Sequence, residues 1–372
     1  MTCLNLLIAT KVIHLLKRVA SPCKHKTYFM KKTFLLLLLF ISCINTYLSA
    51  QIEFVKKNDH DIQVLINKKL FTDFFYSDTF PKPVLYPIYA ADGEIITRGF
   101  PLAPRPNEPT DHPHHVGLWL NYENVNGLDF WNNSYAIPAE KKNLYGSIKT
   151  DSAFTTTNGE HGILTYDADW QDQKGNILLK EVTKYVFIAQ GDMRIIDRIT
   201  TLTARQNVSF PDTKDGMLGL RVAHELELPS KEEREFTDNK GNITKVKANN
   251  DKSVTGNYIT NEGKTGDDAW GTRGRWCMLY GKKGNDTISI AIIDHPDNVG
   301  YPTYWHARGY GLFAANPLGQ KVFSNGKEEL NFKLVNGQSV IFRYRIVINS
   351  GKQRLTNDEV NKLADEFATL RE

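Results

Sequence analysis

Imidazole and indole side chains are concentrated in one stretch of the sequence, residues 111–131 (DHPHHVGLWLNYENVNGLDFW). From His114 onward the stretch alternates as a half-buried strand does. The alternation places one set of side chains toward a core (Val116, Leu118, Leu120 and Tyr122) and the other set toward a polar, aromatic cleft (His115, Gly117, Trp119 and Asn121). Pro113 cannot donate to a β-ladder, so the strand is predicted to begin after it, with Asp111 and His112 on the preceding loop.

Rings and imidazoles that project together from a rigid strand suit a sugar ligand. The C–H faces of a sugar stack on aromatic rings, and its hydroxyls need hydrogen-bond donors and acceptors. We therefore place Trp119 and His112 among the substrate-binding candidates, and His114 and His115 among the catalytic ones. In the alternative interpretation, this is an ordinary strand entrance whose histidines satisfy loop carbonyls.

A second stretch, residues 304–310 (YWHARGY), follows a repeat of the tripeptide Asp-His-Pro at residues 294–296. In an extended chain Tyr304, His306, Arg308 and Tyr310 share one face. Two phenols, an imidazole and a guanidinium on one face are more typical of a site than of a solvated surface. Trp305 is added as a possible stacking residue.

Leu218 to Leu228 also alternates, and the pattern predicts a strand. His224 falls in line with five aliphatic residues, so we interpret it as a core histidine. Arg221 and Glu225 share the polar face and are predicted to bind substrate, with a simple cross-strand ion pair as the alternative.

The remaining pattern predicts an all-β fold. Strands at 146–157, 162–170, 177–189 and 194–203 are separated by the turn signals Asn158-Gly159, Lys174-Gly175-Asn176 and Gly191-Asp192. This spacing is typical of large stacked antiparallel sheets rather than of a parallel sheet with crossover helices. A capping box at residues 356–359 predicts a C-terminal helix whose apolar stripe (Val360, Leu363, Phe367 and Leu370) docks on a sheet. Residues 229–269 are predicted to be a polar loop insertion in a single domain, 51–372.

Residues 1–50 are interpreted as a secretory leader, because Lys31 and Lys32 precede an apolar run and small residues near Ala50 suit cleavage. Met30 is a natural start for this leader. The leader carries seven Lys and Arg and no acidic residue, which leaves 39 basic and 42 acidic residues in the mature chain. The sequence therefore favours a periplasmic or secreted protein without a membrane span. It does not favour nucleic acid or an anionic membrane surface as a partner. Only Cys277 remains after cleavage, so no intrachain disulfide is expected.

The motif at 111–131, together with HPDNVGYPTYWHARGYGLFAANPLG at 295–319, resembles a family of secreted bacterial proteins labelled PmoA-like. The resemblance extends from about Val64 to Ile348. We discount the methane-oxidising activity in that label, because the chain has neither membrane spans nor a Cys/Met copper set. The resemblance implies a β-sandwich similar to the galactose-mutarotase supersandwich and a role beside polysaccharide-degrading and sugar-oxidising enzymes. The residues that it carries over are His112, His114, His115, His306 and Arg308.

These residue types fit elimination on a uronic-acid-containing oligosaccharide by a dehydratase or lyase. Elimination beside a carboxylate needs a base, a cation for the enolate-like charge, and an acid for the departing oxygen. We assign His115 or His306 as the base, Arg308 and Arg221 to the carboxylate, Tyr304 as the acid, and His114 to the orientation of its neighbour. No cofactor is expected.

Four alternatives to elimination use some of these residues or their neighbours differently. An epimerase or mutarotase needs the same side-chain types, whereas glycoside hydrolysis is disfavoured because Glu225 and Asp129 are the only candidate carboxylate pair. A metal site is conceivable at His112 and His114, completed by His295 or Glu123, although we predict no metal. A periplasmic sugar-binding protein would use four indoles as stacking platforms: Trp119, Trp131, Trp270 and Trp305.

Overall fold

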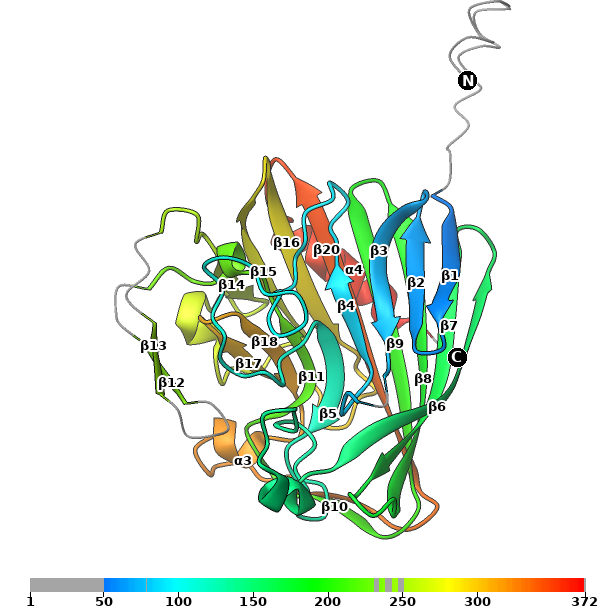
Figure 1. The fold of residues 1–372 in the computed structure, drawn as a ribbon. Helices are drawn as coiled ribbons and strands as arrows, with labels where there is room; N and C mark the ends of the chain where they lie inside the picture. Colours follow the sequence, from blue (N-terminus) through cyan, green and yellow to red (C-terminus); the bar gives the residue numbers. More distant parts are fainter. Residues whose placement is uncertain (1–49, 78, 231–233, 238–242, 247–250, 371–372) are drawn as a thin grey trace, which may run out of the picture. The chain divides into compact units, whose positions relative to one another are not determined.

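Strands joined by tight turns form most of the chain, as the alternation predicts. The structure, a computed structural model, describes residues 50–370 except residues 78, 231–233, 238–242 and 247–250 (Figure 1). The predicted cleavage near Ala50 and the leader before it therefore fall at the border of the described residues or outside them. Within the described residues, no helix is long and apolar enough to cross a membrane.

Eight strands form the first sheet, and its neighbouring strands all pair antiparallel. Across the sheet they are β1 (Ile52–Asn58), β2 (Asp61–Ile66), β3 (Lys69–Phe75), β4 (Val84–Ile88), β5 (Leu118–Tyr122), β11 (Gly216–Arg221), β18 (Leu312–Asn316) and β17 (Tyr304–Arg308). Half of this sheet thus comes from the two segments with candidate site residues and from the strands that lie between them.

Eight further strands form the second antiparallel sheet. Its order is β14 (Asn257–Thr260), β15 (Trp276–Lys283), β16 (Asp286–Asp294), β20 (Ser339–Gly351), β9 (Met193–Ala204), β8 (Ile177–Gln190), β7 (His161–Gln171) and β6 (Ser147–Thr157). The predicted strands between 146 and 203 are confirmed. Gly159, Gly175 and Gly191 have positive φ in the hairpin turns, as the turn signals require.

The main core lies between the two sheets, because apolar side chains from both belong to one buried cluster. Two small ribbons, β10 (Val208–Phe210) with β19 (Phe332–Leu334) and β12 (Arg234–Thr237) with β13 (Ile243–Val246), stand apart from the large sheets. The predicted all-β antiparallel sandwich is therefore confirmed. Residues 229–269 are not purely a loop, since they include the β12–β13 ribbon and β14, whose Tyr258 is buried against Phe313.

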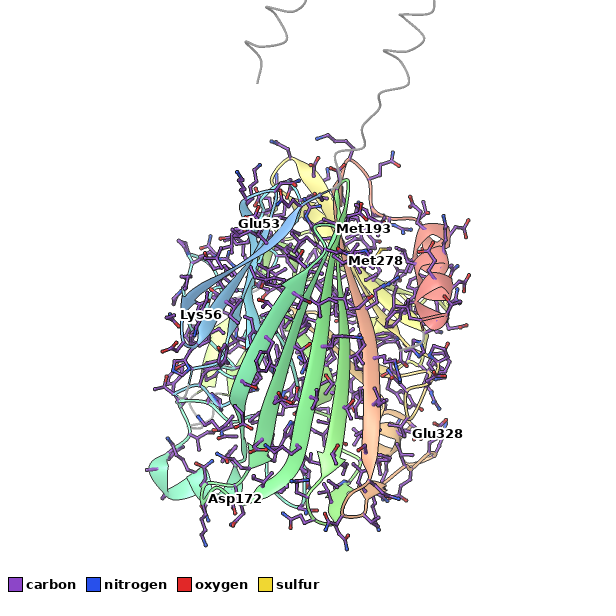
Figure 2. All side chains as sticks on the ribbon, turned by 90° about the vertical axis from the view of Figure 1, so that its right-hand side faces the viewer. Glu53, Lys56, Asp172, Met193, Met278 and Glu328 are labelled. Atoms are coloured by element: carbon purple, nitrogen blue, oxygen red, sulfur yellow. The ribbon has the colours of Figure 1, made fainter. Side chains whose placement is uncertain are left out.

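The C-terminal helix α4 (Asn357–Ala368) covers the outer face of the second sheet, where Met278 is part of the shared apolar cluster (Figure 2). Its predicted capping box is present: Thr356 Oγ1 accepts from the Glu359 N–H at 3.2 Å, and Glu359 accepts from the Thr356 N–H at 2.7 Å. Leu370 lies beyond the helix and is exposed, so the predicted stripe ends at Phe367. The short helices are α3 (Gln320–Phe323), η1 (Ala139–Leu144), η2 (His224–Leu226) and η3 (Gly266–Ala269).

Inside the sandwich, the ion pair between Arg198 and Glu181 is fully buried. Arg198 Nη2 lies 2.8 Å from Glu181 Oε1, and Glu181 also accepts from the Tyr166 hydroxyl at 2.5 Å and from the Trp170 indole N–H at 2.7 Å. Arg198 also donates to the Tyr185 hydroxyl. Charges removed from water in this way are tolerated because each has several hydrogen-bond partners.

We predict that Arg198→Met destabilises the fold by about 3–5 kcal/mol, because the Glu181 carboxylate would stay buried without its cation. Urea unfolding measures the change. The matched control is Lys180→Met, which removes an exposed cation from Asp151 and Asp169, each at 2.9 Å, and should cost less than about 1 kcal/mol. Equal losses for the two variants would contradict this account of the core.

Candidate functional site

The face of the first sheet that points away from the core gathers both candidate segments. Trp119 of β5 lies opposite Gly219 of β11, Gly219 opposite Ala314 of β18, and Ala314 opposite His306 of β17. Two residues further along β11, Arg221 lies opposite Leu312 of β18, and Leu312 lies opposite Arg308 of β17. The predicted alternation of side chains along β5 is confirmed from Leu118 onward. Leu118, Leu120 and Tyr122 pack in the main core, and Trp119 packs on the outer face of the sheet.

Val116 departs from that parity. It packs with Trp119 on the outer face, because β5 begins only at Leu118 and the chain turns before it. Gly117 makes this turn at φ +56, where a Cβ would lie 2.1 Å from the Leu85 carbonyl oxygen. The histidines therefore stand on a loop folded over the sheet and not on a strand.

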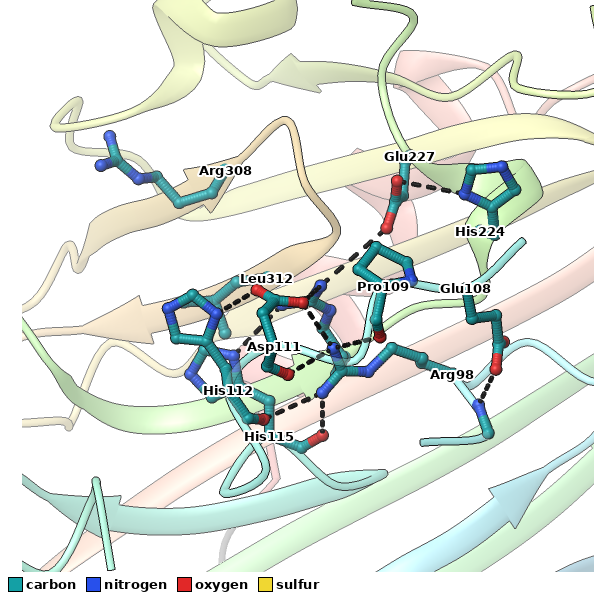
Figure 3. Close-up of polar contacts among 12 residues, drawn as sticks. Arg98, Glu108, Pro109, Asp111, His112, His115, His224, Glu227, Arg308 and Leu312 are labelled. Atoms are coloured by element: carbon teal, nitrogen blue, oxygen red, sulfur yellow. Dashed lines mark hydrogen bonds and ion pairs between the residues drawn. The ribbon is translucent and has the colours of Figure 1, made fainter. Parts of the chain in front are cut away.

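Arg98 holds that loop together (Figure 3). Its guanidinium donates to the backbone carbonyls of Pro109 (3.2 Å), Asp111 (2.9 Å), His112 (2.9 Å) and His115 (3.2 Å). Burial and the neighbouring positive charge of Arg221 together lower the pKa of Arg98 to about 9. A cation with this many fixed acceptors remains charged at neutral pH and fixes the loop's shape.

The Asp111 carboxylate is shared by three partners (Figure 3). Oδ1 lies 3.0 Å from Arg98 Nη1 and 3.4 Å from Arg221 Nη2, and Oδ2 contacts Nδ1 of His112. Burial by itself would raise the pKa of Asp111, but Arg221, His112 and Arg98 together hold it well below its usual range. Asp111 is therefore a carboxylate throughout the physiological pH range.

His112 is the most exposed imidazole of the cluster. Its side chain is 23% exposed, whereas His114 and His115 are buried. The His112 ring is almost parallel to those of His115 (4.8 Å) and Tyr310 (5.4 Å). Its backbone has φ +47, in the left-handed region that residues other than glycine and asparagine seldom adopt and that is often found at functional sites.

The hydrogen bond to Asp111 also fixes the tautomer of His112. A carboxylate only accepts, so Nδ1 carries the proton and Nε2 carries the lone pair of the neutral ring. Burial lowers the pKa of His112 despite the opposing effect of Asp111. The ring is therefore neutral at neutral pH and suited to accept a proton at Nε2.

His115 and His114 lie beneath this surface. His115 Nδ1 is 3.3 Å from Arg221 Nη1, which can only donate, so His115 accepts through Nδ1. Burial lowers the pKa of both rings well below its ordinary value. The His114 carbonyl accepts from Lys82 Nζ at 2.7 Å. Both histidines are better placed to support His112 than to exchange protons with a ligand.

The second segment borders His112 through Tyr310. Arg221 lies 4.9 Å from the centre of the Tyr310 ring, so this ring covers the buried arginine and stacks on His112. Arg308 is half-buried, with its guanidinium 5.2 Å from the ring centre of Trp270. Figure 3 shows Arg308 on the same side as His112 and directed away from Asp111. The structure thus brings His112, Arg221 and Arg308 to one side of the sheet, as predicted.

His306 shares this face but is 1% exposed. Its Nδ1 lies 3.1 Å from the Lys214 carbonyl oxygen and 3.5 Å from Asp215 Oδ1. Burial and the positive charges of Arg308 and Lys214 together lower its pKa to about 3. So weak a base hardly binds a proton at neutral pH, which argues against the predicted role of His306 as base.

Three predicted residues lie apart from this group. The Tyr304 hydroxyl donates to Glu328 at 3.1 Å, and its ring stacks on Phe323 at 5.4 Å. The side chain of Trp305 lies on the opposite face of β17 from that of His306 and packs in the main core. Glu225 binds Lys283 at 2.6 Å.

His224 is not a core residue, because β11 ends at Arg221 and the chain turns into η2, which abolishes the alternation. Its Nδ1 lies 3.3 Å from Glu227, which in turn reaches Arg221 at 3.9 Å.

Three important residues were not in the predicted set. Tyr310 had a signal, since it shares the face of His306 and Arg308, and Asp111 directly precedes His112. The sequence around Arg98 carries no signal of its role apart from being rich in proline. That role depends on carbonyl groups that come together only in the folded loop.

The proposed metal set is not assembled. His295 packs against Phe367 of α4 at 5.1 Å, on the opposite side of the second sheet from the main core. Among the described residues, no group of three or more His, Cys, Asp or Glu is arranged to hold a metal ion. Among the described residues, Cys277 is a free and buried cysteine.

Comparison with known proteins gives one family and several similar folds. The model of DUF6807, described as a family of unknown function, matches residues 61–365. The PmoA-like label suggested by the motifs does not appear in this match. No curated protein matches the sequence.

Solved structures resemble the chain at low identity, which concerns the fold alone. Galactose 1-epimerase from Lactobacillus acidophilus NCFM has a TM-score of 0.40 and 9% identity over 82% of this chain and 100% of its own. The GH36 α-galactosidase AgaB from Geobacillus stearothermophilus has a TM-score of 0.38 and 11% identity over 81% of this chain and 41% of its own. A family 97 glycoside hydrolase from Pseudoalteromonas sp. strain K8 has a TM-score of 0.30 and 9% identity over 82% of this chain and 34% of its own.

We predict that the buried His306 makes stability depend on pH. An unfolded chain binds a proton on this imidazole near pH 6.5, whereas the folded protein binds it only near pH 3. Between these values the unfolded state holds more protons, so His306 destabilises the fold as pH falls, by about 1.4 kcal/mol per pH unit. His306→Asn lacks this effect. Urea unfolding is measured between pH 6.5 and 4. As pH falls, the free energy of unfolding of His306→Asn should rise relative to that of the wild type by this amount for each pH unit. A difference between the two proteins that does not change with pH would contradict the prediction.

Proposed function

The chain belongs to the DUF6807 family, and we propose that this member is a carbohydrate-active enzyme that performs elimination on uronic-acid-containing oligosaccharides. The observation that carries the proposal is the partly exposed His112, held by Asp111 and stacked on Tyr310 beside Arg308. These residues supply a base, an acid and a cation on one side of the sheet. Export to the periplasm or the medium, expected from the leader, is part of the proposal.

His112 is the proposed base. Its Nε2 takes the proton from the carbon next to the sugar carboxylate, and the electrons of that C–H bond form the new carbon–carbon double bond. Asp111 stabilises the imidazolium that forms, as a carboxylate does when it hydrogen-bonds the distal nitrogen of a catalytic histidine. Arg98 and Arg221 keep Asp111 ionised, so Asp111 stays a negatively charged carboxylate while His112 holds the proton.

Tyr310 is the proposed acid, in place of Tyr304. Burial raises the pKa of its phenol, so the hydroxyl holds a proton at neutral pH and can give it to the oxygen that leaves as the C–O bond breaks. Its parallel stacking on His112 places base and acid on the same side of a bound sugar. Epimerisation, which needs proton exchange on opposite faces of the sugar carbon, fits this arrangement less well.

Arg308 is the proposed ligand of the sugar carboxylate. It is half-buried and lies over Trp270, where a guanidinium is partly desolvated and binds a carboxylate more strongly than it would in water. Around Asp111, the two buried guanidiniums of Arg98 and Arg221 face the two carboxylates of Asp111 and Glu227, so these four charges balance. Arg308 thus adds a positive charge to a balanced group, which favours an anionic sugar.

We predict that Asp111→Asn lowers kcat about 10²- to 10⁴-fold on uronic-acid oligosaccharides, with a much smaller effect on KM. An amide can donate to His112 Nδ1 and shift the ring proton to Nε2, which removes the base. The matched control is Asp286→Asn, at an exposed pair with Lys352, which should retain activity within about twofold.

The assay uses a panel of galacturonate and glucuronate oligosaccharides, with products identified by mass and by the absorbance of a double bond conjugated to the carboxylate. Loss of water or chain cleavage with this absorbance supports elimination. Gain of water indicates hydrolysis, and unchanged mass with altered NMR signals indicates epimerisation. Either of these results, or full activity of Asp111→Asn, would reject the proposed mechanism.

A further inference from the structure

One ring nitrogen of His306 has no hydrogen-bond partner although the side chain is buried. The Lys214 carbonyl can only accept, so His306 Nδ1 carries the ring proton and Nε2 is left as an acceptor. That Nε2 atom is buried and unpartnered. Since the two ring nitrogens point in widely different directions, Nε2 points away from the loop that contains Lys214. His306 lies two residues before Arg308 on the same face of β17, so it lies near the proposed reaction site.

Trp119 contributes a second unpartnered nitrogen at the other end of the same row. Its indole Nε1 is buried and has no acceptor. The edge of the ring that carries Nε1 lies over Gly219, where a Cβ would come within 2.7 Å of Cε2. Trp119 has little freedom to turn, because it stacks on His115 at 5.4 Å and Lys82 Nζ lies 4.7 Å from its ring centre. The indole N–H is therefore a fixed donor.

The two residues between Trp119 and His306 in this row have small side chains or none, and the Trp131 ring also lies over this part of the row. Gly219 and Ala314 occupy the row from Trp119 to His306, and Gly219 is separated from His306 by two strand spacings, roughly 10 Å. A larger residue at Gly219 would collide with Trp119 and Trp131. The row therefore has a donor at one end, an acceptor at the other and no polar group of its own between them.

Buried donors and acceptors are nearly always satisfied in proteins, and an exception usually has a water molecule or a ligand as its partner. Here one such donor and one such acceptor lie on the same sheet face as His112 and Arg308. Neither is charged, so they match the hydroxyl groups of a sugar better than its carboxylate.

We propose that His306 and Trp119 form a hydroxyl-recognition subsite beside the Asp111–His112 pair. His306 Nε2 accepts a hydrogen bond from a free sugar hydroxyl, and Trp119 Nε1 donates to another oxygen of the bound sugar. The inference rests on the proposed carbohydrate ligand and refines it: the carboxylate lies at Arg308, and a hydroxyl that is not methylated lies at His306. His306 is thus a specificity-determining residue and not the proton acceptor.

The test compares His306→Asn with His306→Gln. Asn places an amide where Nδ1 was, which keeps a donor to the Lys214 carbonyl but removes the acceptor at the Nε2 position. Gln places its amide at that position. Trp119→Phe removes the indole N–H and keeps an aromatic ring, and His295→Asn is the control for loss of a buried imidazole elsewhere.

Titration calorimetry measures the dissociation constants of the galacturonate and glucuronate trisaccharides and a neutral galactose trisaccharide. A probe that is turned over is measured in a Tyr310→Phe background, which removes the proposed acid and keeps the ring that stacks on His112. We expect His306→Asn and Trp119→Phe to weaken binding of the best probe about 10- to 100-fold. His306→Gln should recover most of the loss, and His295→Asn should bind as the wild type does. Without ligand, His306→Asn should melt near the wild-type temperature, because it removes an atom with no partner.

Binding that is unchanged in His306→Asn, or weakened equally in the Asn and Gln variants, overturns the subsite. A large fall in melting temperature with unchanged affinity also overturns it, because it assigns His306 a structural role only. Binding that depends on His306 without any turnover supports the subsite and rejects the elimination mechanism. If no probe binds, both proposals fail.

Discussion

The Asp111 carboxylate, placed between two buried arginines, is the interaction on which the site depends. Arg98 uses the same guanidinium to bind this carboxylate and four carbonyl groups of the 109–115 loop, so the loop's shape and the ionisation of Asp111 have one cause. Arg221 connects the loop to β11 through Asp111 and to Tyr310 through its guanidinium. Removing the carboxylate would leave Arg98 without its ion-pair partner and Arg221 with only the longer contact to Glu227 at 3.9 Å, which is unfavourable in a protein interior.

The sandwich supplies the rigid base for this arrangement. Its apolar residues fill the space between the sheets, so the outer face of the first sheet is left for polar and aromatic groups. Antiparallel register then aligns positions that are far apart in the sequence, and His306, Gly219 and Trp119 fall in a single row. The chemistry of the site therefore follows from strand order as much as from any one motif.

The sequence predicts the fold better than it predicts the site. Alternation and turn glycines define β6 to β9 closely, because each depends on residues near in the chain. The same parity correctly places His306 and Arg308 on one face. It fails at His224, where the strand ends early, and at Val116, where a loop precedes β5. The choice of His112 over His115 depends on burial and on contacts with Arg98 and Tyr310, which no local pattern encodes.

The central claim is that burial keeps His112 neutral while Asp111 fixes the ring proton on Nδ1 and leaves the lone pair on Nε2. Nitrogen-15 NMR of histidine-labelled protein at neutral pH, with the His112 signals assigned by comparison with a His112→Gln variant, tests this claim most directly. The account predicts a protonated Nδ1 and an unprotonated Nε2 for His112. A charged ring, or a proton on Nε2 with Nδ1 bare, would contradict it.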